Sequence, residues 1–275
     1  MTDHQESDIG SGSWKDPLKG CIVQNDLIFG DMDSNLSDAG RLIDSIPDDD
    51  IDLIVLPELF ATGFDYEGFP EHIRRAGEVT DLMKRIAVEA GSHIIFTQIV
   101  EDGGRIFNRL FMIGRKGDVI GHYDKTHLFT RAKEDKHFTR GDHLTLFEME
   151  GVKVGPLICY ESRFPELSRR LVLDGAQILV YPSQWPEFRV DQWTTLLRAR
   201  AIENQCFVIG SGVCGGHENS PMGGMSSAFS PFGDLLGEIG KGEGWVVFEM
   251  DPVVMNKLRR KIPVLREIRE DLEIS

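Results

Sequence analysis

Residues 51–58 read IDLIVLPE. The run 51–56 is almost wholly apolar and rich in isoleucine, leucine and valine, which is typical of a strand buried on both faces of a parallel sheet. Pro57 ends the run, because proline has no N–H to give to a strand ladder. Glu58 follows at once, so the sequence predicts a carboxylate at the end of a buried strand, where α/β sheets place their ligand sites.

Similar runs recur along the chain and predict further buried strands. They are CIVQ (21–24), HIIFTQIV (93–100), VKVGPLICY (152–160), ILVYP (178–182) and CFVIGSGV (206–213). Between them, apolar residues at helical spacing predict helices over 36–46, 79–90 and 189–205. The segments 107–123 and 223–250 are typical of short strands joined by turns. This alternation predicts an α/β fold of mixed sheets with helices on their outer faces.

The length of 275 residues and the absence of an internal linker favour a single domain over 19–275. We expect 1–18, which is rich in Ser, Gly and Asp, to be a flexible tail. The charged segment after Pro263 is consistent with either a short docked helix or a frayed end.

Composition excludes several classes of partner. The 30 Lys and Arg residues against 45 Asp and Glu give a net charge of −15, which argues against binding to nucleic acid. No apolar run is long enough to span a membrane, and the N-terminal segment lacks the pattern of a secretory signal. We therefore expect a cytoplasmic protein without a membrane partner. We also expect its four cysteines, which form no C-x-x-C pair, to be reduced thiols.

Two more polar residues follow predicted strands. Lys125 lies in YDKTHLF (123–129), and Cys159 ends a strand just before ESRFPE (161–166), where Pro165 indicates a helix start. A thiol near a helix N-terminus is expected to have a lowered pKa. Taken singly, these residues also fit a solvated lysine and an inert buried cysteine.

Taken together, the strand-end motifs resemble those of a known family. The segments LPELFATGF (56–64), YDKTHLF (123–129) and CYESRFPE (159–166) resemble the nitrilase superfamily of carbon-nitrogen hydrolases, and are most like its omega-amidase branch. YPSQWP (181–186) and RAIENQ (200–205) extend the similarity. The resemblance implies a four-layer αββα sandwich of two mixed β-sheets with outer helices. It also implies a homodimer formed through helices that begin near Arg163 and Arg189.

The resemblance further implies roles for individual residues. Glu58 is expected to be the general base, Lys125 the cation that stabilises the oxyanion, and Cys159 the nucleophile. Glu134 is expected to orient substrate and lysine, and the backbone N–H of Tyr160 to help bind the oxyanion. Arg163 and Trp185 match substrate contacts, and Arg163 is expected to hold a distal carboxylate by a two-pronged hydrogen bond.

The implied reaction is hydrolysis of the terminal amide of a small carboxylate-bearing substrate, such as 2-oxoglutaramate or 2-oxosuccinamate. It yields the acid and ammonia through a cysteine thioester and needs no metal or organic cofactor. Where many relatives have Asp and an aliphatic residue after Cys-Tyr, this chain has Glu161 and Ser162, a difference expected to affect the shape of the pocket.

Five alternatives stay open at this point. An N-carbamoyl amidohydrolase or a nitrilase would use the same Glu-Lys-Cys triad, and a catalytically silent binding protein would keep the fold. A Cys-His thiol hydrolase would pair Cys159 with His127, leaving Glu58 and Lys125 without a role. A zinc site would use the histidines that crowd one segment, although their spacings fit no common metal motif. These histidines are His122, His127, His137 and His143.

Overall fold

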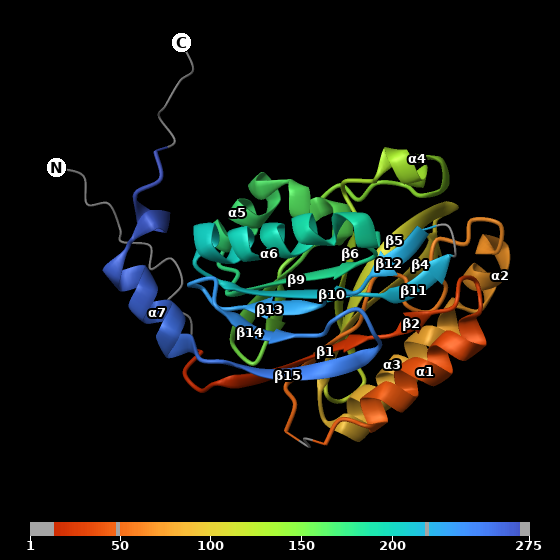
Figure 1. Ribbon diagram of the computed structural model, residues 1–275, viewed down its shortest axis with the longest axis horizontal. Helices are drawn as coiled ribbons and strands as arrows, with labels where there is room; N and C mark the ends of the chain where they lie inside the picture. Colours follow the sequence, from red (N-terminus) through yellow and green to blue (C-terminus); the bar gives the residue numbers. More distant parts are fainter. Residues whose placement is uncertain (1–13, 48–49, 218–219, 270–275) are drawn as a thin grey trace, which may run out of the picture.

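The structure is a computed structural model that describes residues 14–47, 50–217 and 220–269. Two six-stranded mixed sheets form its centre (Figure 1). In spatial order, the first sheet consists of β15 (Gly244–Met250), β1 (Leu18–Gln24), β3 (Leu53–Val55), β4 (His93–Asp102), β5 (Arg105–Ile113) and β6 (Val119–Asp124). The second consists of β14 (Leu235–Glu238), β13 (Ser227–Phe229), β10 (Phe207–Gly212), β9 (Ile178–Ser183), β8 (Val152–Pro156) and β7 (Phe147–Met149).

Each sheet has three parallel strands at its centre and antiparallel strands at its edges. β1, β3 and β4 are parallel in the first sheet, and β8, β9 and β10 are parallel in the second. These central strands are the apolar runs found in the sequence, because parallel strands are covered on both faces. A small third sheet contains β12 (Ser220–Gly223), β11 (Cys214–His217) and β2 (Asp26–Leu27).

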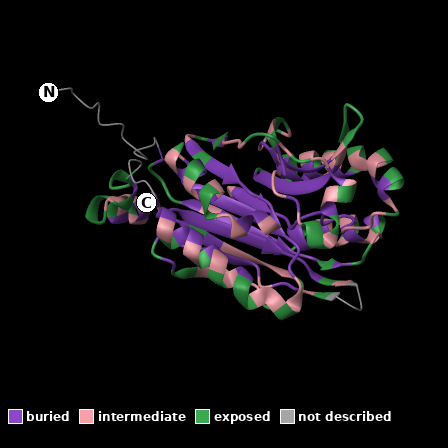
Figure 2. Cartoon of the chain, turned by 90° about the horizontal axis from the view of Figure 1, so that it is seen from above, coloured by how far each residue is buried: buried purple, intermediate pink, exposed green. Residues whose placement is uncertain are grey.

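Helices cover the two outer faces of the stacked sheets (Figures 1 and 2). α1 (Met32–Asp44) and α3 (Ala76–Ala90) lie on the first sheet, and α5 (Pro165–Leu173) and α6 (Val190–Asn204) lie on the second. The other helices are α2 (Phe69–Arg74), α4 (Glu134–His137) and α7 (Pro252–Lys261), with 3-10 turns η1 (Thr130–Ala132), η2 (Cys159–Arg163), η3 (Glu187–Arg189) and η4 (Val264–Arg266). The predicted αββα sandwich is confirmed.

Strand alternation divides the core into layers. On β3, Leu53 and Val55 pack in the cluster that contains residues of the second sheet, whereas Ile54 packs in a separate cluster with α1 and α3. Successive side chains of a strand point to opposite faces, so one short apolar run contributes to both interfaces. The helices predicted at 36–46, 79–90 and 189–205 are α1, α3 and α6, and α3 ends as expected at Gly91, whose φ is +61°.

The two ends of the chain differ from expectation in detail. The flexible tail is expected to extend to residue 18, but the packed part of the chain begins earlier. Trp14 is only 5% exposed, and its ring packs on Phe207. Residues 1–13 of the expected tail lie outside the described ranges. After Pro263 the chain forms η4, where Leu265 is buried, so this part is a docked turn. Within the described ranges, none of the helices combines the length and the apolar content needed to cross a bilayer.

Candidate active site

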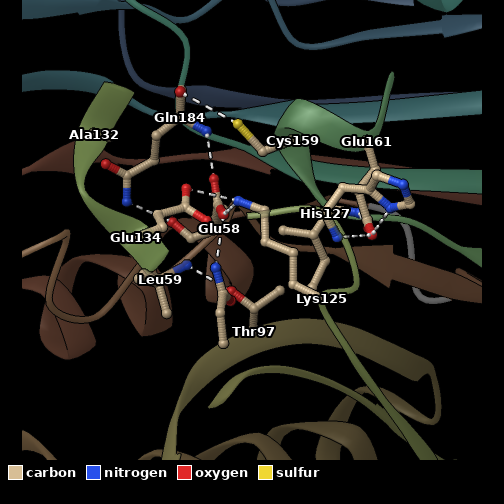
Figure 3. A network of polar contacts seen from close by, with 12 residues as sticks. Glu58, Leu59, Thr97, Lys125, His127, Ala132, Glu134, Cys159, Glu161 and Gln184 are labelled. Atoms are coloured by element: carbon tan, nitrogen blue, oxygen red, sulfur yellow. Dashed lines mark hydrogen bonds and ion pairs between the residues drawn. The ribbon is translucent and has the colours of Figure 1, made fainter. Parts of the chain in front are cut away.

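Three polar side chains from separate strand ends meet in the interior (Figure 3). Glu58 follows β3, Lys125 follows β6, and Cys159 lies three residues after β8. The Lys125 Nζ is 2.8 Å from Glu58 Oε1, and the Cys159 thiol donates a hydrogen bond of 3.5 Å to the backbone carbonyl of Gln184, whose backbone N–H donates to Glu58 Oε2. All three side chains are buried. The structure thus brings together the three residues that the sequence placed at strand ends.

Glu134 joins this group from α4. Its Oε1 accepts a hydrogen bond of 2.9 Å from Lys125 Nζ, while its Oε2 is buried and has no hydrogen-bond partner among the described residues. Tyr66 holds the segment in place, because its hydroxyl donates to the Ala132 carbonyl at 2.7 Å and its ring stacks on His137. One lysine ammonium therefore lies between two buried carboxylates, and one carboxylate oxygen remains free to accept.

Two neighbours of Glu58 were missed in the sequence. Asn108 Nδ2 donates to Glu58 Oε1 at 2.8 Å. The Gln184 backbone N–H donates to Glu58 Oε2 at 3.2 Å, and the Gln184 side chain donates to the Glu58 carbonyl at 2.7 Å. A signal existed for both: Asn108 is the uncharged polar residue inside the apolar strand β5, and Gln184 directly follows β9. These donors fix the orientation of the carboxylate.

Burial and neighbouring charges set the ionisation of the site. Burial raises the pKa of Glu58; the charge of Lys125 opposes this and that of Glu134 adds to it, leaving the pKa above its ordinary value. Burial alone would lower the pKa of Lys125, but the carboxylates of Glu134 and Glu58 outweigh it and hold that pKa well above the ordinary range. Lys125 is therefore an ammonium ion, and Glu58 is a stronger base than an exposed carboxylate.

The expected lowering of the Cys159 pKa is wrong. Burial and the nearby Glu58 carboxylate raise the pKa of this thiol well above its ordinary value, and Lys125 offsets only part of the effect. The expectation relied on a helix N-terminus, yet Cys159 itself opens the short 3-10 turn η2, with a left-handed φ of +49°. The resting group is a neutral thiol beside a base.

Glu161 lies away from the pocket whose shape it was expected to affect. It is fully buried and does not line the cavity described below, nor does Ser162. Its Oε1 accepts hydrogen bonds from the Tyr123 hydroxyl, from the backbone N–H and hydroxyl of Thr126, and from the His127 backbone N–H. Its Oε2 accepts from the Ile158 backbone N–H at 2.7 Å. Glu161 therefore joins the segment after Lys125 to the segment before Cys159.

A cavity of about 360 Å³ opens onto Cys159 and Glu134. Tyr160, expected to bind the oxyanion, and Arg163 and Trp185, expected to contact substrate, also line it. Tyr160 lies in the first turn of η2, where backbone N–H groups have no acceptor within the helix. The Arg163 guanidinium lies over the Trp185 ring, 4.6 Å from its centroid, and the buried Trp185 Nε1 has no hydrogen-bond partner among the described residues.

The histidines do not assemble around Cys159. His127 Nδ1 lies 2.9 Å from the Thr126 hydroxyl, and its ring packs on Phe164. His137 stacks on Tyr66, and His143 pairs with its neighbour Asp142. In the part of the chain that the structure describes, no group of three or more potential ligands is arranged to hold a metal ion. Among these described residues, neither a Cys-His dyad at Cys159 nor a zinc site has the contacts that it requires.

A buried thiol linked through Gln184 to a carboxylate base, beside a fixed ammonium and a cavity, defines the class of enzymes that use cysteine as a covalent nucleophile. Comparison with known proteins agrees with this class. The family model described as carbon-nitrogen hydrolase matches residues 21–260. A 2-oxoglutaramate amidase of Bacillus subtilis is 35% identical over 252 residues, which cover 91% of this chain and 97% of that protein.

Two further proteins extend the comparison. An omega-amidase of Xenopus tropicalis is 31% identical and is matched over 86% of this chain and 90% of its own. The crystal structure of a CN-hydrolase superfamily protein from Xanthomonas campestris has a TM-score of 0.86 and 27% identity, covering 94% of this chain and all of that one. The chain belongs to the carbon-nitrogen hydrolase family. It is therefore a hydrolase of carbon-nitrogen bonds other than peptide bonds, and the predicted likeness to the omega-amidase branch is confirmed.

Proposed function

We propose that this protein is an amidase of the omega-amidase type, which hydrolyses the terminal amide of a small carboxylate-bearing acid such as 2-oxoglutaramate or 2-oxosuccinamate. The observation that carries the proposal is the convergence of the buried Cys159 thiol, the Glu58 carboxylate and the Lys125 ammonium next to a cavity of small-molecule size. The relatives named as 2-oxoglutaramate amidase and omega-amidase support this substrate class.

In the first half of the reaction, Glu58 takes the proton of the Cys159 thiol as the sulfur attacks the amide carbon. This transfer is needed because the resting thiol is neutral. Negative charge then builds on the carbonyl oxygen, where Lys125 Nζ and the Tyr160 backbone N–H stabilise it. Glu58 returns the proton to the nitrogen, and the carbon-nitrogen bond breaks. Ammonia departs, and the acyl group stays bound to Cys159 as a thioester.

In the second half, Glu58 takes a proton from a water molecule as its oxygen attacks the thioester carbon. The tetrahedral species forms at the same oxyanion donors and collapses with cleavage of the carbon-sulfur bond. The proton held by Glu58 returns to the sulfur, which restores the thiol and releases the carboxylic acid. The raised pKa of Glu58 suits both steps, because a base accepts and returns protons most effectively when its pKa is close to the working pH.

Glu134, Trp185 and Arg163 position the substrate in this scheme. The free Oε2 of Glu134 is available to accept a hydrogen bond from the substrate amide N–H₂, while Oε1 holds Lys125. Trp185 offers an unpaired indole N–H at the cavity wall, which Arg163 supports by stacking. This arrangement orients the amide before the sulfur attacks.

The proposed enzyme is a cytoplasmic homodimer. Its outer helices α5 and α6 offer a face for self-association, on which Leu196 and Thr195 line a shallow groove and Ile202 is 48% exposed. Sedimentation at micromolar concentration is expected to give twice the mass of one chain. A Leu196→Glu variant is expected to sediment as a monomer, because it places a charge in the paired face.

The activity is tested by ammonia release from 2-oxoglutaramate. We expect steady release by the wild type and by Cys214→Ala, which removes a buried thiol outside the site. We expect no release by Cys159→Ala. On the wild type quenched during turnover, intact mass measurement is expected to show one acyl adduct, and peptide mapping is expected to place it on the peptide that contains Cys159.

Other outcomes distinguish the remaining candidates. Release of carbon dioxide together with ammonia from an N-carbamoyl amino acid, without release from 2-oxoglutaramate, would assign the site to carbamoyl compounds. Conversion of nitriles alone would assign it to nitrile hydrolysis. A folded wild type that acts on none of these substrates would leave only the silent binding protein and would refute the proposal.

A further inference from the structure

Three arginines converge on the cavity that opens onto Cys159, although the whole chain is acidic. Arg131 comes from η1, Arg163 from η2 and Arg189 from η3, and all three line the cavity. Among the described residues, no carboxylate forms an ion pair with any of them; the acid on the same wall, Glu134, is held by Lys125. The cavity mouth therefore carries positive charge that an anionic ligand would neutralise.

Arg163 is already engaged. Its Nη2 donates to Gln192 Oε1 at 2.7 Å, and its guanidinium stacks on Trp185. A guanidinium binds a carboxylate most strongly through two parallel hydrogen bonds from one edge. The Gln192 contact uses one N–H of Nη2, and the stacking holds the guanidinium against the Trp185 ring, so the present contacts of Arg163 support the cavity wall.

Arg189 is free by comparison. Its Nε is buried and has no hydrogen-bond partner among the described residues. Its guanidinium lies over the rings of Phe129 and Phe188, at 5.5 and 4.9 Å from their centroids. Burial, followed by the like charges of Arg163 and Arg131, lowers its pKa. A bound carboxylate would give the buried Arg189 Nε–H an acceptor. It would also offset the repulsion among the three arginines.

We propose that Arg189, assisted by Arg131, is the anchor for the distal carboxylate of the substrate, and that Arg163 braces the Trp185 wall. This rests on the proposed amidase function and assigns the residues that recognise the carboxylate of its substrates. The Phe129 and Phe188 rings hold the Arg189 guanidinium by cation–π contact, which fixes its position for an ion pair. Arg189 thus has the role in carboxylate binding that the family resemblance implied for Arg163.

The test compares two amides of nearly equal shape, succinamate and 4-oxopentanamide, in which an acetyl group replaces the carboxylate. For Arg189→Met we expect kcat/KM on succinamate to fall about 100-fold, mostly through KM, with kcat/KM on the neutral amide within about twofold of wild type. Arg163→Met is expected to impair both amides alike. Arg140→Met, which removes an exposed arginine outside the cavity, serves as the matched control.

Binding measured without turnover separates this inference from the function. In the Cys159→Ala background, calorimetric binding of succinamate is expected to weaken about 100-fold on Arg189→Met and to stay unchanged on Arg140→Met. Undiminished succinamate binding by the Arg189 variant, or selective loss in the Arg163 variant, would overturn the assignment. Absence of hydrolysis by the wild type would instead overturn the amidase function, while the binding data would still decide the role of Arg189.

Discussion

Glu161→Gln tests whether one buried carboxylate holds the two catalytic segments together. Four donors meet Oε1 and one meets Oε2, at distances from 2.6 to 3.1 Å. Glutamine keeps the shape but makes one of the two oxygens an amino group. In its better orientation the oxygen serves the four donors, and the amino group faces the Ile158 backbone N–H.

This geometry sets the expected loss of stability. One charge-assisted hydrogen bond is lost, worth about 1.5–3 kcal/mol, and two buried donors are left facing each other. We expect the free energy of unfolding to fall by about 3 kcal/mol. Because the displaced segments carry Lys125 and Cys159, kcat is expected to fall as well, with less effect on KM. Glu148→Gln, at an exposed position on β7, is expected to change stability by less than about 0.5 kcal/mol.

Denaturant unfolding at several pH values checks the role of the charge. Burial tends to raise the pKa of Glu161, but the hydrogen bonds from His127, Thr126 and Tyr123 outweigh it, and the pKa lies below the ordinary 4.5. A lowered pKa in the folded state stabilises the protein fully above pH 4.5, and this stabilisation is lost as the pH falls through the folded value. The difference between wild type and Glu161→Gln is therefore expected to shrink below pH 4.5. Equal stability of the two proteins at pH 7 would refute the reasoning.

Three other predictions follow from the site and the core. Lys125→Met is expected to lower kcat at least about 1,000-fold in ammonia release, because it removes an oxyanion donor and leaves two carboxylates unpaired, whereas the exposed Lys153→Met is expected to keep full activity. The pH profile of kcat/KM is expected to fall on the acid side with a midpoint above 4.5, since Glu58 must be ionised and its pKa is raised; a midpoint at or below 4.5 contradicts this. Trp14→Ala is expected to lower the free energy of unfolding by about 3 kcal/mol in urea, because its ring packs on Phe207. An unchanged midpoint would place Trp14 outside the cooperative core.

Much of the fold could be predicted from local patterns. The central strands are apolar because both faces are covered, and α3 ends at Gly91 because a left-handed residue closes the helix. The short helices α2 and α4 were missed, since four to six residues carry too little periodicity to stand out. The packing of Trp14 was missed because its partner, Phe207, is remote in sequence.

The sequence by itself determined the family and the three strand-end residues, because Glu58, Lys125 and Cys159 each lie in a motif whose chemistry can be recognised locally. Only the tertiary structure decided how they are ionised. Lys125 and Glu58 are 67 positions apart, and their pKa values depend on burial and on each other's charge. It also decided that Glu161 joins two segments, that Arg189 has a buried donor without a partner, and that Arg163 is bonded to Gln192. Hydrogen-bond partners and desolvation arise from contacts across the fold, which neighbouring residues in the sequence do not specify.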